Sequence, residues 1–390
     1  MATTHSLTEQ APEASASWTR IWTLEALRYR GSGWWLDAAL PRSPVGLVAA
    51  AIALPLAWFA LGLAVTHDRG AYVATHDVSC QMWFFPLHLI CVRIVGGLWA
   101  GGLEPALDGL ALPETARRRI RRGALGTWAN VGGLVAAGYF IFRDISFGLT
   151  PGANGLIPFD DPDLWGFAAL GRPVHILMLV LWCIEWVLFG YLLWLQIWTL
   201  TGWLRQVRRH DFRPHLGTVL VGDGYRHAFT LFAKTATVCL VFALGNLAFI
   251  YFTGELIPRE SVEIASVGDF LRQMSDLLST TLLFVVIVAA VYLFATTLKR
   301  RLTRAVNQEL AAAGDVALAE MARPLALAGD PTVDLERLRA RVDAQSGLLR
   351  AAIFQREVDA LGTRTMVSII VKSLVPLVTA GLKIKKLFGA

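Results

Sequence analysis

The chain contains six long apolar runs, and these constrain its fold more than any other feature. A helix of about 20 apolar residues is long enough to cross the hydrocarbon core of a bilayer. Because lipid offers no partner for backbone N–H and C=O groups, each crossing must be helical. We therefore predict an all-α fold, a polytopic membrane helix bundle with six transmembrane helices and a cytoplasmic helical tail. The predicted spans are residues 45–65, 81–102, 123–142, a part of 173–204, 235–252 and 277–298.

Composition favours a membrane protein over a soluble one. Charged residues make up 17% of the chain and hydrophobic residues 55%, whereas soluble domains carry about 25% charged residues. The net charge of +6 would also suit a nucleic-acid-binding protein. However, no basic stretch is interleaved with stacking aromatic residues in a soluble module, so nucleic acid is not an expected partner. The lipid bilayer is the partner that the composition predicts.

Arginine and lysine concentrate in alternate connections between the runs. The N-terminal arm, the second and fourth loops and the segment after the sixth run carry four or five basic residues each, whereas the three remaining loops together carry five. Basic loops stay on the cytoplasmic side of a membrane. We therefore predict a multi-pass protein of the cell inner membrane with both termini in the cytoplasm. Arginine outnumbers lysine 30 to 6, which favours a bacterial protein.

These features divide the chain into three parts. Residues 1–43 form a cytoplasmic N-terminal arm, whose residues 18–40 mix aromatic side chains with Arg28 and Arg30. This mixture is typical of a helix that lies on the inner leaflet. Residues 44–298 form the six-span transmembrane domain. Residues 299–390 form the cytoplasmic helical tail, which begins as an Ala- and Leu-rich continuation of the sixth span.

The tail contains two further apolar features. One is a stripe with alternating spacings of three and four residues within 331–361, and such spacing is typical of a short coiled coil. The stripe comprises Leu335, Leu338, Val342, Gln345 and Leu349. It equally favours a contact with a second copy of the chain and a helix that packs back on its own chain.

The other is the segment 366–382, which is apolar but contains Lys372. A lysine near the centre of a crossing helix costs roughly 2.5–3.5 kcal/mol. We therefore expect a terminal amphipathic or re-entrant segment there instead of a seventh crossing.

Two opposite charges lie inside the predicted spans, Arg93 in the second and Glu185 in the fourth. Both spans run from the outside inwards, and each charge lies about 12 residues, or about 18 Å, from the outer end. Because a charge inside the membrane is costly, pairing offsets much of that cost. We predict that Arg93 and Glu185 face each other. The pair is either a polar site on a conduction or transport path or an ion pair that sets the register of two helices.

Five other polar residues are weaker candidates. His88 and His175 are residue types that bind haem or metal, but their predicted depths differ and no carboxylate accompanies them, so we expect helix-end histidines. Asn130 and Asn246 are expected to form hydrogen bonds between helices. Lys234 lies near the inner end of the fifth span, where a lysine extends its ammonium group to the headgroups.

Motifs of enzymes and cofactor sites are absent from the sequence. There is no GxxxxGK[ST], HExxH or GxSxG, and no GxGxxG between a strand and a helix. No cofactor, no metal and no catalytic residue are therefore predicted, and an enzyme is the less favoured class. The leading hypothesis is a channel or transport-type protein for an ion or small solute. The alternatives are a membrane scaffold or sensor whose cytoplasmic helices bind a protein partner, and a membrane enzyme that acts on lipid.

Overall fold

The computed structural model describes residues 34, 40–41, 43–110, 112–149, 170–210, 224–252 and 275–322, together with scattered positions between 336 and 349. Within these residues every regular element is a helix and there is no strand. The all-α prediction is therefore confirmed for the described part. The predicted surface helix at 18–40, apart from Trp34 and Leu40, and the predicted terminal segment at 366–382 lie outside the described residues.

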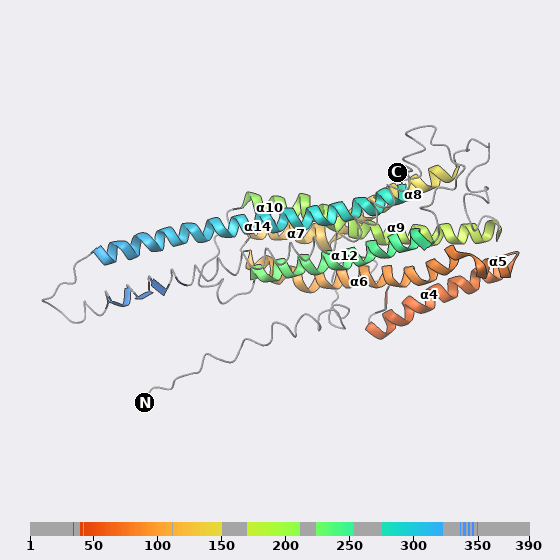
Figure 1. The fold of residues 1–390 in the computed structure, drawn as a ribbon, viewed down its shortest axis with the longest axis horizontal. Coiled ribbons are helices and arrows are strands. Elements are labelled where there is room, and N and C mark those ends of the chain that lie inside the picture. Colours follow the sequence, from red (N-terminus) through yellow and green to blue (C-terminus); the bar gives the residue numbers. More distant parts are fainter. Residues whose placement is uncertain are drawn as a thin grey trace, which may run out of the picture.

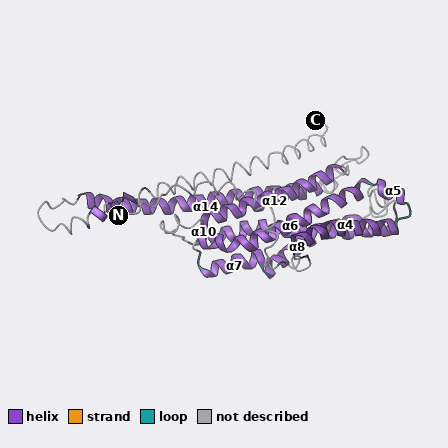
Figure 2. Cartoon of the chain, turned by 90° about the horizontal axis from the view of Figure 1, so that it is seen from below, coloured by secondary structure: helices purple, strands orange, loops and turns teal. Residues whose placement is uncertain are grey.

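Long helices run side by side along one axis (Figure 1). Short elements lie at both ends of this bundle: α5 lies at one end, and α7 and α10 lie at the other, in both views (Figures 1 and 2). Helix α14 extends past the α7 and α10 end, as expected for 48 residues, which span about 72 Å. The elements are α4 (Pro44–Val65), α5 (Arg69–Ala74), α6 (His76–Gly109), α7 (Glu114–Leu125), α8 (Thr127–Leu149), α9 (Arg172–Trp198), the π-helical turn η3 (Thr199–Trp203), α10 (Leu204–Arg209), α12 (Gly224–Phe252) and α14 (Ser275–Ala322).

Four of the described helical stretches are long and apolar enough to cross a membrane. They are Pro44–Val65, Met82–Asp108, Arg172–Arg209 and His227–Asn246, and the bent pair α7–α8 would make a fifth. The chain therefore has the helices of a multi-pass membrane protein. Helix α14 contains the sixth predicted span but is not among these stretches, so the count of six stays a prediction.

The third predicted span, 123–142, is not one continuous helix, because the chain bends by 43° between α7 and α8. The carbonyl groups in the last turn of a helix lack partners within it. Three indole N–H groups donate to carbonyl oxygens at the end of α7: Trp34 to Ala124 at 3.0 Å, Trp194 to Gly123 at 3.0 Å and Trp198 to Ile120 at 3.2 Å. Gly123 and Ala124 are in this last turn, so two of the three tryptophans stabilise backbone groups that lipid would leave unpaired, and all three connect other segments to α7 beside the bend.

Helices α8 and α9 approach each other closely through glycine. A Cβ added at Gly132 would overlap the Trp194 indole, and one added at Gly190 would overlap the carbonyl oxygen of Gly133. Small residues at a contact allow two helix backbones to pack without an intervening side chain. The opposite face of α8 is exposed and apolar, as at Val135 and Phe142, which is typical of a lipid-facing surface.

An aromatic cluster joins α14 to the bundle. The Trp203 ring lies 5.6 Å from Trp99 of α6, 4.8 Å from Phe232 of α12 and 5.4 Å from Phe294 of α14, measured between ring centroids. Trp203 is the last residue of the π-helical turn η3, which breaks the regular helical register after α9. All four rings are buried. Four separate elements thus meet around Trp203.

We expect Gly190→Ala to lower the free energy of unfolding by about 1–3 kcal/mol, because the added methyl group forces α8 and α9 apart. The measurement is the thermal unfolding midpoint in detergent. Gly138→Ala is the matched control, since a Cβ at Gly138 meets nothing within 4 Å and should leave stability within about 1 kcal/mol of wild type. Equal effects of the two variants would contradict the close approach.

Candidate functional site

The structure brings His88 of α6 and Glu185 of α9 together in the interior of the bundle. His88 Nδ1 lies 2.6 Å from Glu185 Oε2. The side chain of His88 is 3% exposed and that of Glu185 is 15% exposed. With the carboxyl group ionised, the Nδ1–H of His88 donates a charge-assisted hydrogen bond to it. Two titratable groups therefore share one short contact inside apolar helices.

Helix geometry explains why these two residues meet. His88 follows His76, the first residue of α6, by 12 residues, and Glu185 follows Arg172, the first residue of α9, by 13. At 1.5 Å per residue, both lie about 18–20 Å along their helices. Thr66 comes just before the short helix α5, which leads directly into α6, and Leu170 comes just before α9. The Thr66 hydroxyl donates to the Leu170 carbonyl at 3.4 Å, so α6 and α9 begin at the same end of the bundle. Equal distances from one end place the side chains at one depth.

Both side chains keep one buried polar atom without a hydrogen-bond partner among the described residues, Nε2 of His88 and Oε1 of Glu185. The Nε2 edge faces α12, because a Cβ added at Gly245 would lie 3.1 Å from it. The Phe242 ring lies 4.2 Å from the imidazole, between centroids. A buried polar atom without a partner is costly and is uncommon in structures outside functional sites. The pair thus has unused bonding capacity at both ends.

Arg93, the predicted partner of Glu185, lies on the same helix as His88, five residues further along, or about 7.5 Å. It is 2% exposed. The side chain of Arg93 is thus buried on the α7 and α10 side of the His88–Glu185 contact. The Arg93–Glu185 pair stays a prediction, and His88 is the residue that sequence analysis ranked too low.

The other predicted polar residues lie apart from this contact. His175 is buried in the first turn of α9, ten residues or about 15 Å before Glu185. Asn130 accepts a hydrogen bond from the Tyr191 hydroxyl at 2.6 Å and thereby links α8 to α9. The side-chain amide of Asn246 donates at 3.3 Å to the carbonyl of Phe242 in its own helix, so this bond is local and not between helices. Lys234 is half-buried on α12.

Sequence analysis missed a second charged cluster, between α8 and α9. Arg143 and Asp144 form an ion pair at 2.5 Å, and the Trp186 indole donates to the other carboxylate oxygen at 2.6 Å. The Arg143 guanidinium lies 5.3 Å from the centroids of both the Phe140 and the Trp186 ring. The prediction ended the third span at residue 142, whereas α8 continues to Leu149. These charges are therefore part of a helix and not of a loop.

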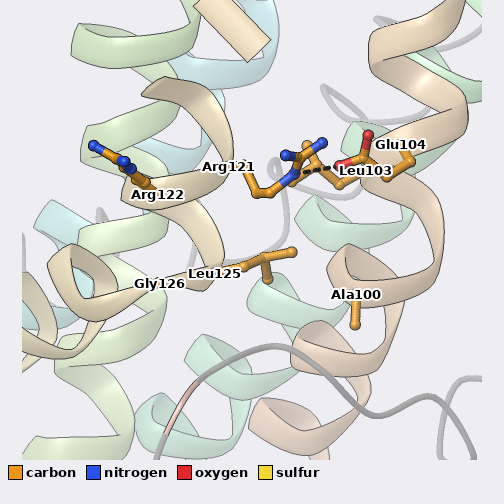
Figure 3. A pocket seen from close by; sticks show the side chains of 7 residues that line it. All are labelled: Ala100, Leu103, Glu104, Arg121, Arg122, Leu125 and Gly126. Atoms are coloured by element: carbon orange, nitrogen blue, oxygen red, sulfur yellow. Dashed lines mark hydrogen bonds and ion pairs between the residues drawn. The ribbon is translucent and has the colours of Figure 1, made fainter. Parts of the chain in front are cut away.

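A cavity of about 300 Å³ lies between α6 and α7 (Figure 3). Arg121 crosses it to Glu104, with Nε 2.7 Å from Oε1, and Arg122 points away from this ion pair (Figure 3). Glu104 follows His88 by 16 residues, or about 24 Å along α6. The cavity is therefore separate from the His88–Glu185 contact. Its lining residues are Ala100, Leu103, Glu104, Arg121, Arg122, Leu125 and Gly126.

Similarity to known proteins does not assign a function to this site. No protein-family model, curated protein or solved structure matches the chain. Among the residues that the structure describes, no three His, Cys, Asp or Glu side chains gather around one point. The hypotheses on function therefore depend on the geometry of His88 and Glu185.

We expect His88→Phe and Glu185→Leu each to destabilise the protein by about 1–3 kcal/mol, because each leaves the other polar group buried without its partner. The double variant should lose less free energy of unfolding than the sum of the two single losses, and the difference, the coupling energy, should be about 0.5–3 kcal/mol. Thermal unfolding in detergent measures this coupling. As a control, His175→Phe combined with Glu185→Leu should be additive within about 0.5 kcal/mol. Additivity in the first pair would contradict the contact.

Proposed function

We propose that this chain is a channel or transport-type protein of a bacterial inner membrane that moves an ion or a small solute. The observation that carries the proposal is the hydrogen-bonded His88–Glu185 pair inside helices that are apolar enough to span a membrane. Ionisable residues within such helices are rare, face the interior of the bundle, and mark ion or substrate pathways and proton relays. The buried Arg93 on the same helix extends the polar core of this proposed pathway.

The proposed topology has six spans, α14 being the last, and both termini in the cytoplasm. Its support is the charge distribution at the end of the bundle where α7 and α10 lie. Three of the five α7 arginines form ion pairs there, Arg117 with Asp108, Arg118 with Glu114 and Arg121 with Glu104. Arg119 and Arg122 are exposed. Under the proposal this arginine-rich end faces the cytoplasm, where anionic headgroups attract cations.

A membrane scaffold or sensor is the second candidate. One observation favours it: the described apolar residues of the tail stripe, Leu338, Val342 and Leu349, are 58%, 56% and 64% exposed. Each of these three side chains keeps more than half of its surface exposed, which leaves them available to a cytoplasmic protein or a second copy. A scaffold would give no flux in the assay below. The hypothesis of a lipid-acting enzyme gains no comparable support from the described residues.

Purified protein in vesicles should raise conductance or solute flux above that of empty vesicles. Glu185→Gln should reduce this rate at least about tenfold, equivalent to 1.4 kcal/mol, because the amide cannot ionise. The measurements are planar-bilayer conductance and osmotic swelling of vesicles. Glu104→Gln is the matched control, at an acidic residue on α6 about 24 Å along that helix from His88, and should preserve flux. Correctly folded wild-type protein without flux of any tested ion or solute would overturn the proposal.

Labelling from either side tests the topology. We expect a cysteine at Arg119 on α7 to react with a membrane-impermeant maleimide only in inside-out vesicles, since basic segments stay in the cytoplasm. A cysteine at Val73 on α5, which is 53% exposed, should react only in intact cells with a permeable outer membrane. Both variants are made with the native cysteines replaced by alanine. Reaction of both positions from the same side would contradict the proposed orientation.

A further inference from the structure

We propose that the species exchanged at the His88–Glu185 pair is the proton. This inference rests on the proposed function, because it names the ion that the same site handles. Two features of the site carry it: the number of ligands that the site offers and the bonding pattern of the imidazole.

The ligand count separates a proton from a metal cation. Zinc takes four protein or water ligands, and calcium takes six to eight oxygen atoms. Among the described residues no group of three or more His, Cys, Asp or Glu side chains is placed to hold a metal ion, and the rings of Phe242 and Phe84 lie beside His88. A proton needs one acceptor atom. The carboxylate would also repel an anion, so a proton suits the pair best.

The bonding pattern allows the pair to pass a proton from end to end. The two contacting atoms, His88 Nδ1 and Glu185 Oε2, are 2.6 Å apart, and the outer atoms Nε2 and Oε1 have no hydrogen-bond partner among the described residues. A proton from water that arrives at Nε2 forms an N–H bond there. The Nδ1–H bond then breaks, and its proton forms an O–H bond with Oε2 of Glu185. The imidazole remains neutral, and the carboxylate becomes a neutral acid.

Release completes the exchange. Glu185 loses its proton to water and becomes a carboxylate again, so one proton has crossed the pair. Rotation of the imidazole then lets water on the entry side deliver a proton to Nδ1 and remove one from Nε2, which restores the Nδ1–H form with no further net movement of protons. Gly245 positions α12 against the ring without a side chain, since a Cβ there would lie 3.1 Å from Nε2 and 3.6 Å from Cδ2. The carboxyl group is the more exposed partner, at 15% against 3%, and is the end at which release to water is expected.

Other titratable groups occur on the helices around the pair, among the side chains that the structure describes. α4 carries none between Pro44 and Val65. Asp144 of α8 lies beside Trp186, the residue after Glu185, and is paired with Arg143. Further titratable groups on these helices include Cys91, Arg93 and Glu104 on α6, His175, Cys183 and Tyr191 on α9, and Lys234 and Cys239 on α12. His88→Phe and Glu185→Gln change only the two residues of the 2.6 Å contact, so they test the pair itself.

The test uses full-length protein in vesicles that contain a pH-sensitive dye, with a potassium gradient and valinomycin to set the membrane potential. Wild-type protein should acidify the vesicles, and His88→Phe and Glu185→Gln should each reduce the rate at least tenfold. His175→Phe, a buried histidine outside the pair, is the matched control and should retain the wild-type rate. Proton flux that is equal in all four proteins would overturn the proton assignment to this pair.

A second measurement keeps this inference distinct from the proposed function. Nitrogen-15 NMR of histidine-labelled protein in bilayers reports which imidazole nitrogen of His88 carries a proton, and Glu185→Gln should change its response to pH. Flux of another ion or of a solute without proton flux would overturn the assignment of the proton and would still support the proposed transport function. A coupled His88 titration without any flux would support proton exchange and overturn transport. If neither flux nor a coupled titration of His88 is observed, both the proton assignment and the proposed function are overturned.

Discussion

The absence of water in a bilayer is the constraint on which this structure depends, because every polar group on a crossing helix must find its partner within the protein. The described helices meet this need with side chains. Tryptophan indoles donate to the last carbonyl groups of α7, where the chain bends before α8. Tyr191 donates to Asn130 between α8 and α9. Other buried side chains, among them Trp58 and Tyr72, also keep an unpaired polar atom, but His88 and Glu185 combine theirs with a 2.6 Å contact between two titratable groups, and for that reason they are the best-supported functional centre.

Packing in this bundle combines very small and very large residues. At Gly190 the backbones of α8 and α9 approach until no side chain fits between them, and at Gly132 the Trp194 indole occupies the space that a Cβ would fill. Elsewhere large rings fill the space, as where Trp203 meets aromatic residues from three other helices. Dispersion and hydrogen bonding hold membrane helices together, since lipid tails are as apolar as the side chains and provide little hydrophobic drive. Glycine also lies next to the pair, because Gly245 allows α12 to approach the imidazole of His88.

The contact between His88 and Glu185 was not predicted from the sequence, and the way depth was counted explains why. Depth was counted from residue 81, where the apolar run begins, and this matched Arg93 with Glu185. Helix α6 begins five residues earlier, at His76, and the same count then reaches His88. Hydropathy marks the apolar stretch but not the first helical residue, and an error of five residues moves a side chain by about 7.5 Å and more than one turn. The end of α8 was misplaced for the same reason, so Arg143 and Asp144 were assigned to a loop.

The sequence by itself determined that the chain is helical and apolar enough to cross a membrane several times, and that its arginines concentrate in alternate connections between the apolar runs. These properties follow from composition and from the length of each run, which local chemistry sets. Only the tertiary structure decided that Glu185 meets His88, that three tryptophans from two distant segments donate to α7 beside the bend at Gly126, and that Gly245 lies against the imidazole. Such contacts depend on the rotation and axial shift of whole helices, and a run of apolar residues specifies neither.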